Sequence, residues 1–92
     1  MIERIAEAAY EAHGSQVPWS VLPDWRRESW RLIAAAMSDA WEKGEGLSAQ
    51  QIYAVWSEYR YIASWRGLTK SQREVWERVA AIEPMPAEGI AA

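Results

Sequence analysis

The 92-residue sequence contains no cysteine and no phenylalanine, and its single histidine is His13. The absence of cysteine excludes disulfide bonds, thiolate nucleophiles and zinc fingers. Enzymes usually show a nucleophile with its base, a metal cluster or a phosphate-binding loop. No firm Ser/His/Asp set can be built on one histidine, and no glycine-rich loop is present. We therefore expect a protein that is not an enzyme and that has no metal or other cofactor.

Long apolar runs and surplus positive charge are also missing. No segment approaches the ~18 apolar residues of a membrane-spanning helix, and the first residues include Glu3 and lack the apolar core of a signal peptide. The formal net charge of −3 argues against a protein whose main task is to bind nucleic-acid phosphates. We expect a soluble cytoplasmic protein with no membrane contact and no strong direct binding to nucleic acid.

The sequence is instead rich in tryptophan, and it repeats itself. Seven tryptophans and four tyrosines supply large side chains for the core of one small domain. Residues 18–35 align without a gap on residues 64–81. The identical pairs are Trp19/Trp65, Leu22/Leu68, Arg27/Arg73, Glu28/Glu74, Trp30/Trp76, Ala34/Ala80 and Ala35/Ala81. An internal repeat of this kind predicts two related structural units.

The spacing of the apolar residues predicts four helices and no strand. We expect helices over residues 2–13, about 23–43, from Ser48 to before Gly67, and from Thr69 to before Pro84. Ser48 with Gln51, and Thr69 with Gln72, have the spacing of capping boxes. The third helix is expected to bury a face that extends to Ile62 and Ala63. His13 is expected to cap the first helix, because a cation is favoured at a helix C-terminus.

The predicted fold is therefore an all-α, four-helix domain over residues 1–83. It consists of two related helical-hairpin units, about 5–37 and 51–83, which we expect to be related by a pseudo-two-fold axis, and residues 84–92 are expected to form a flexible tail. Large apolar residues at helical spacing belong to the core as a rule. We therefore expect the paired tryptophans to be structural, with Trp19 and Trp65 holding each turn onto its helix.

The first candidate surface is a line of acids. Glu3, Glu7 and Glu11 recur every four residues, which places three carboxylates about 6 Å apart along the first helix. The favoured interpretation is an ordinary exposed helix face. The alternative is an uncompensated acidic ridge that faces a basic groove on a partner protein.

The second candidate surface is an arginine cluster in the second predicted helix. Its members are Arg26, Arg27 and Arg31, which stand beside Trp25 and Trp30. Arginine interleaved with aromatic residues can hold phosphates or stack on bases. With a negative net charge, we favour ion pairing with Asp24, Glu28 and the acids of the first helix.

The third candidate surface is the segment 59–66, which is dense in tyrosine, tryptophan and arginine. These are the residue types that dominate protein interfaces. Tyr59, Tyr61 and Trp65 cannot all face one core, so part of this aromatic surface is expected to lie outside. We expect ligand or partner contacts from Tyr61, Trp65 and Arg66, with Arg60 as an alternative ligand contact.

The first unit resembles small bacteriophage proteins related to the ryanodine-receptor repeat (RyR) domain. The resemblance rests on residues 5–12 and on the pattern Trp-x-x-Leu-Pro-x-x-x-Arg, which starts at Trp19. It covers residues 5–35 well and 52–80 loosely. The second unit lacks the Gly-Trp-x-Tyr-Gly and Lys-x-His-Pro segments of that family, so no ligand site is carried over. The resemblance implies an α-helical accessory protein of phage or prophage origin, in a family suspected of sensing ligands.

Three functional hypotheses follow. The leading one is a non-enzymatic phage or mobile-element protein that binds and inhibits a host protein, such as a nucleic-acid-binding defence complex, in the manner of an anti-CRISPR protein. The alternative is a module for a small, nucleotide-like ligand, and the third is a DNA-binding regulator that uses the arginine cluster. A flat acidic or aromatic patch would favour the first, a pocket enclosed by aromatic residues the second, and a continuous basic face the third.

Overall fold

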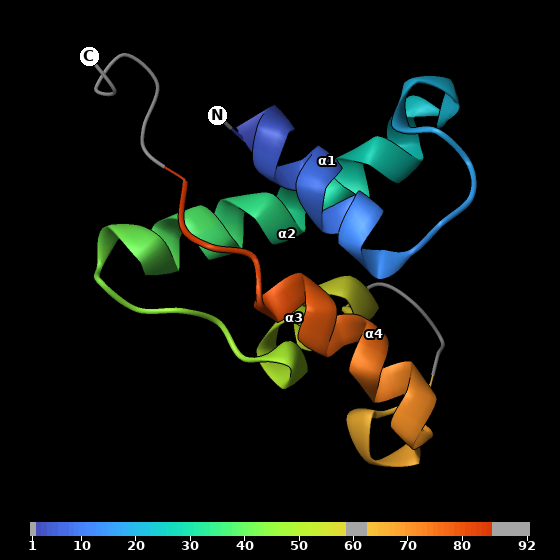
Figure 1. The fold of residues 1–92 in the computed structure, drawn as a ribbon, viewed down its shortest axis with the longest axis vertical. Helices are drawn as coiled ribbons and strands as arrows, with labels where there is room; N and C mark the ends of the chain where they lie inside the picture. The colour runs from blue at the N-terminus through green and yellow to red at the C-terminus, as the bar shows by residue number, and fades with distance from the viewer. Residues whose placement is uncertain (1, 59–62, 86–92) are drawn as a thin grey trace.

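A computed structural model describes residues 2–58 and 63–85, and in these residues the chain is entirely helical apart from its connecting loops. The elements are α1 (Ile2–His13), the 3-10 turn η1 (Trp19–Val21), α2 (Asp24–Glu42), α3 (Ala49–Ser57), the 3-10 turn η2 (Trp65–Gly67) and α4 (Lys70–Ala80). The predicted all-α, four-helix class is confirmed. Among the described helices, α1 and α3 each pack on both α2 and α4 (Figure 1).

The helix starts follow the local capping signals. The bounds of α1 match the prediction, and α2 begins one residue after Pro23, which is its N-cap. Both capping boxes are formed. The Ser48 N–H donates to Gln51 Oε1 at 2.8 Å and the Gln51 N–H donates to Ser48 Oγ at 3.1 Å. In α4, Thr69 and Gln72 make the same pair of bonds at 2.8 and 3.2 Å.

The predicted extent of the third helix is wrong, because α3 ends at Ser57. Ala63 is exposed and lies outside any helix. Its carbonyl accepts a hydrogen bond from the Tyr53 hydroxyl, so this segment is held by a side chain rather than by helical hydrogen bonds. Ile62 lies outside the described residues, as does most of the predicted tail; at the tail's start, Met85 packs partly buried against the core.

The two units share one aromatic arrangement. Tyr10 and Tyr53 each donate a hydroxyl hydrogen bond to the carbonyl two positions before the tryptophan of the following 3-10 turn. The Tyr10 and Trp19 ring centroids lie 5.7 Å apart at 56°, and those of Tyr53 and Trp65 lie 5.8 Å apart at 57°. The correspondence of the units therefore extends into α1 and α3. The pseudo-two-fold relation between them stays a prediction.

The core lies where the two units meet. Trp30 of α2 is 2% exposed and Trp76 of α4 is 4% exposed, and their rings stack with centroids 6.0 Å apart and planes at 19°. Tyr10 packs edge-on against Trp30 at 5.7 Å, and Tyr53 packs edge-on against Trp76 at 5.4 Å. Further buried residues complete this core: Ile5, Ala6, Ala9, Leu22, Ile33, Ala34, Met37, Ala49, Ile52 and Val79.

Removal of either stacked indole is expected to destabilise the whole domain. Trp30→Ala and Trp76→Ala should each lower the free energy of unfolding by about 3–5 kcal/mol, because each leaves a cavity at the junction of the units. Urea melts will measure this, with Trp25→Ala as the matched control because Trp25 is 68% exposed. A loss under about 1 kcal/mol for either buried indole would contradict the core described above.

Candidate functional site

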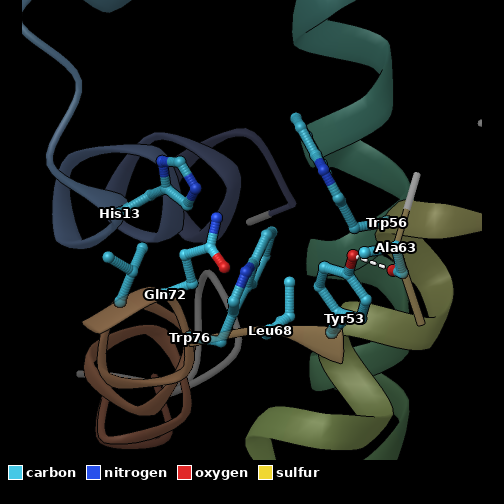
Figure 2. Close-up of a pocket in the computed structure, with 8 residues that line it drawn as sticks. His13, Tyr53, Trp56, Ala63, Leu68, Gln72 and Trp76 are labelled. Carbon is cyan, nitrogen blue, oxygen red and sulfur yellow. Dashed lines mark hydrogen bonds between the residues drawn. The ribbon is translucent and has the colours of Figure 1, made fainter. Parts of the chain in front are cut away.

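A pocket of about 410 Å³ opens where the C-terminal end of α1 meets α3 and α4 (Figure 2). We refer to it as the tryptophan pocket. Its lining residues are His13, Tyr53, Trp56, Ala63, Leu68, Gln72, Val75 and Trp76. Small-molecule sites typically enclose about 300–1,000 Å³ and are lined mainly by apolar and aromatic side chains with a few polar groups. The pocket meets this description in both size and chemistry.

The aromatic wall of the pocket is continuous with the aromatic core. Trp76 belongs to the stacked pair, and Trp56 of α3 lies 4.7 Å from Trp30 and 5.5 Å from Trp76 between ring centroids. Trp56 is only partly buried, whereas Trp76 is 4% exposed. Tyr53 lies one turn earlier in α3, and its hydroxyl donates a hydrogen bond to the Ala63 carbonyl.

His13 completes the wall from the end of α1. Its imidazole lies 5.2 Å from the Trp30 ring, 4.9 Å from the Trp76 ring and 6.1 Å from the Trp56 ring. Burial among these rings lowers the pKa of His13 below its usual value of 6.5, and the nearby Arg78 charge lowers it further. The imidazole is therefore neutral at pH 7, with one nitrogen that donates and one that accepts a hydrogen bond.

The expectation that His13 caps α1 as a cation is wrong. Arg78 of α4 takes that role, with Nε donating to the Ala12 carbonyl at 3.0 Å and a terminal nitrogen donating to the His13 carbonyl at 3.4 Å. Gly14 makes room for this contact. Its φ of +96° suits glycine, and a Cβ there would lie 3.2 Å from the Arg78 guanidinium. His13 is thereby left to face the tryptophans.

The polar groups of the pocket are few. The Gln72 side-chain oxygen accepts the Thr69 N–H in the capping box, which leaves the Gln72 amide N–H groups as donors. No Asp, Glu, Lys or Arg side chain is among the residues that line the pocket. A neighbouring pocket of about 240 Å³ shares His13 and Trp56 and does include a charged side chain, that of Arg26.

The predicted acidic ridge is not uncompensated. Arg31 of α2 binds Glu3, with Nε 2.6 Å from Oε1, and its guanidinium also lies 3.2 Å from carboxylate oxygens of both Asp24 and Glu28. The hydrogen bond from Arg31 lowers the pKa of Glu3, and the same bond raises the pKa of Arg31. Glu7 and Glu11 are exposed, as expected.

The arginine cluster does not form a continuous basic face. Arg31 lies among three carboxylates, which confirms the ion-pairing interpretation for this residue. Arg26 lies over Trp25, with the guanidinium carbon 5.7 Å from the ring centroid. Arg27 is partly buried, and its Nε has no hydrogen-bond partner among the described residues. The three side chains thus have three different environments.

The aromatic segment before α4 is only partly described. Tyr61 and Arg60 lie outside the described residues. Trp65 is partly buried against Tyr53, and the Arg73 guanidinium carbon lies 5.6 Å from its ring centroid. Arg66 is exposed, and its carbonyl accepts a hydrogen bond from Arg73 at 3.1 Å. Trp65 therefore contributes to the packing of its own unit.

Sequence reasoning missed the pocket because it did not align the tyrosines. Tyr10 precedes Trp19 by nine positions and Tyr53 precedes Trp65 by twelve, so the ungapped repeat does not match them. Once the tyrosines are paired, His13 and Trp56 occupy equivalent positions, each three residues later and one helical turn away. That correspondence could have indicated that these two residues meet across the core.

Comparison with known proteins adds no relative, since no family model, curated protein or solved structure matches the chain. Within residues 2–58 and 63–85, no helix is long and apolar enough to cross a bilayer. The same residues contain no group of three or more acidic or histidine side chains placed to hold a metal ion. The case for function therefore depends on the geometry of this chain.

Protonation of His13 is expected to weaken the fold. Because its folded-state pKa is lowered, the unfolded chain binds the proton more tightly, and stability present above pH 6.5 is lost as the pH falls through the window below that value. The slope for one proton is at most about 1.4 kcal/mol per pH unit. Among the described residues, the Arg78 charge acts on the imidazole, and Arg26 lines a neighbouring pocket with it.

Urea melts of the protein and of His13→Gln between pH 8 and pH 5 will isolate this effect, since the carboxylates titrate in both chains. The stability difference should shrink as the pH falls. A difference that stays constant across the range would show that His13 titrates alike in the folded and unfolded states.

Proposed function

We propose that the protein is a small-molecule binding module, and that the ligand occupies the tryptophan pocket. The observation that supports this proposal is an aromatic-lined pocket of about 410 Å³ with few polar groups, at the junction of three helices. Such a pocket, next to a group with a perturbed pKa, is the natural candidate for a binding site. His13 supplies that group.

We propose binding rather than catalysis because of the chemistry and the hydrogen-bond partners of the side chains that line the pocket. The Tyr53 hydroxyl donates its hydrogen bond to the Ala63 carbonyl. His13 faces indole rings, and the lining residues include no serine, threonine, cysteine or carboxylate that it could activate. Aromatic walls with one imidazole and one amide favour recognition of a ring by stacking and by a small number of hydrogen bonds.

Filling the pocket is expected to abolish ligand binding. Ala63 lines the pocket, is exposed and lies outside the helices, so Ala63→Phe places a ring in the hollow with little effect on the core. Small aromatic fragments that bind the unaltered protein should shift the indole N–H signals of Trp56 and Trp76 in NMR spectra. Their affinity should fall at least about tenfold, or 1.4 kcal/mol, in Ala63→Phe.

Ala54→Phe is the matched control, because Ala54 is an exposed alanine of α3 that does not line the pocket. It should leave fragment affinity unchanged. Fragments that bind Ala63→Phe as well as the unaltered protein, or that shift only the exposed Trp25 indole, would rule out the pocket as the site.

A second candidate function, docking on a host protein, is supported by one exposed face of the molecule. Trp25, Val21 and Leu32 are 68, 65 and 47% exposed, and Trp25 and Leu32 lie two turns apart on the same side of α2. We call Trp25 and Leu32 the α2 face; Val21 belongs to the preceding turn η1. Exposed tryptophan is the typical anchor of an interface. Charges of both signs border it, because Asp24 and Glu28 pair with Arg31 while Arg26 lies over Trp25.

The α2 face provides an apolar anchor within the described residues for the inhibitor hypothesis. We propose that a host-protein inhibitor of this architecture would present Trp25 at the centre of its contact. Glu7 and Glu11, which are exposed on α1, would add long-range attraction to a basic nucleic-acid-binding target. This mode of action is independent of the tryptophan pocket and is compatible with it.

For a docking protein, Trp25 should determine the dissociation rate constant, and the charges of Glu7 and Glu11 should determine the association rate constant. For a partner captured from bacterial lysate and then purified, Trp25→Ala should raise the dissociation rate at least about tenfold, whereas Val17→Ala, at another exposed valine, should not. Joint reversal of Glu7 and Glu11 to Lys should lower the association rate more than the same reversal at Glu74 and Glu77 of α4. Surface plasmon resonance in which both changes are silent would reject docking through this face.

A further inference from the structure

We infer that the tryptophan pocket selects a flat, uncharged aromatic ring with a hydrogen-bonding edge, such as an aromatic amide or a nucleobase. This inference rests on the proposed function and goes beyond it by naming the chemical class of the ligand. It follows from three properties of the pocket: its charge, the tilt of its walls and the placement of its polar groups.

Among the described residues, no charged side chain lines the pocket. None of its eight lining side chains is a carboxylate, an ammonium or a guanidinium. The arginines of α4 are committed elsewhere, because Arg73 donates to the carbonyls of Trp65 and Arg66 while Arg78 donates to those of Ala12 and His13. A charged ligand would lose water there without a counter-ion among the eight lining side chains, and a cation would also meet the positive charge of Arg78, which acts on His13.

The walls suit a planar ring. Trp56 and Trp76 pack on each other at 51° with ring centroids 5.5 Å apart, and Tyr53 packs on Trp76 at 72° and 5.4 Å, so the pocket borders a cluster of tilted rings in mutual contact. Aromatic rings attract one another in offset-stacked and edge-to-face arrangements with centroids about 4.5–7 Å apart. A flat aromatic ligand can extend this cluster through a ring contact with Trp56, its partly buried member, whereas an aliphatic ligand can make no contact between two rings.

The polar groups lie together on one side. In Figure 2, His13 and Gln72 stand on one side of the pocket and Tyr53, Trp56 and Ala63 on the other, with Trp76 and Leu68 between them. Gln72 offers amide N–H donors, because its oxygen is held by Thr69. A neutral imidazole offers one donor and one acceptor. A ring that carries both an acceptor and a donor on one edge satisfies this side, which a plain hydrocarbon ring cannot do.

Three probes of nearly equal shape test the charge preference. Benzamide is neutral, benzoate is an anion and benzamidine is a cation, and all three are planar. Titrations followed by the Trp56 and Trp76 indole N–H signals at pH 7.5 should give benzamide an affinity at least tenfold higher than either charged probe. Toluene should bind more weakly than benzamide, because it has no polar edge. Adenine and nicotinamide then distinguish a nucleobase from an aromatic amide as the natural source of the ring.

A single substitution should reverse the charge preference. Gln72→Glu keeps a side-chain oxygen for the Thr69 N–H, so the capping box can persist, but it places a carboxylate at the pocket. Benzamidine should gain at least tenfold in affinity and benzamide should lose. Gln51→Glu is the matched control, since Gln51 occupies the same position in the capping box of α3 and does not line the pocket.

The outcomes separate the two proposals. If no probe shifts the pocket indoles and no other small fragment binds there, the proposed function itself fails. If benzoate or benzamidine binds the unaltered protein as tightly as benzamide does, a ligand site exists but the inferred class is wrong. If Gln51→Glu changes the probe affinities as much as Gln72→Glu, the preference comes from overall charge and not from the pocket, and the inference is again overturned.

Discussion

The stacking of Trp30 on Trp76 is the contact on which the rest of the structure depends. Each indole belongs to one unit, and their contact is where the α2 and α4 surfaces become a common core. A domain of this size buries only about 60–65% of its unfolded surface, so a few large side chains must supply most of the apolar burial. Tyr10 and Tyr53 pack their rings against this pair, and their hydroxyls donate hydrogen bonds to the carbonyls of Val17 and Ala63, in the loops that precede η1 and η2.

The tryptophan pocket follows from a difference between the two units at one equivalent position. Three residues after the anchoring tyrosine, α1 carries His13 and α3 carries Trp56. The smaller imidazole and the larger indole meet beside Trp76, and the hollow next to them remains open. In this account the repeat builds the core, and its departure from symmetry provides the candidate binding site.

Charged side chains tie the helices together at the periphery. Arg31 links α2 to Glu3 of α1, and Arg78 links α4 to the C-terminal carbonyls of α1. Exposed ion pairs of this kind contribute little stability individually. Here the Arg31 pairs remove that arginine from any basic surface and compensate Glu3. The pKa of His13 is lowered mainly by burial in the aromatic cluster and further by the Arg78 charge.

The sequence by itself determined the features that depend on near neighbours. Helical periodicity identified α1, and the ungapped repeat identified the paired tryptophans. The spacing of Ser48 with Gln51 and of Thr69 with Gln72 identified two helix starts. Each of these features depends on contacts within a few positions or on a fixed offset in the sequence. Tertiary structure alone decided the rest. The Glu3–Arg31 pair joins residues 28 positions apart, Arg78 reaches α1 across 66 positions, and the Tyr53 hydroxyl donates to the Ala63 carbonyl ten positions later. Such contacts depend on how the helices pack, and no local pattern of residues encodes that packing.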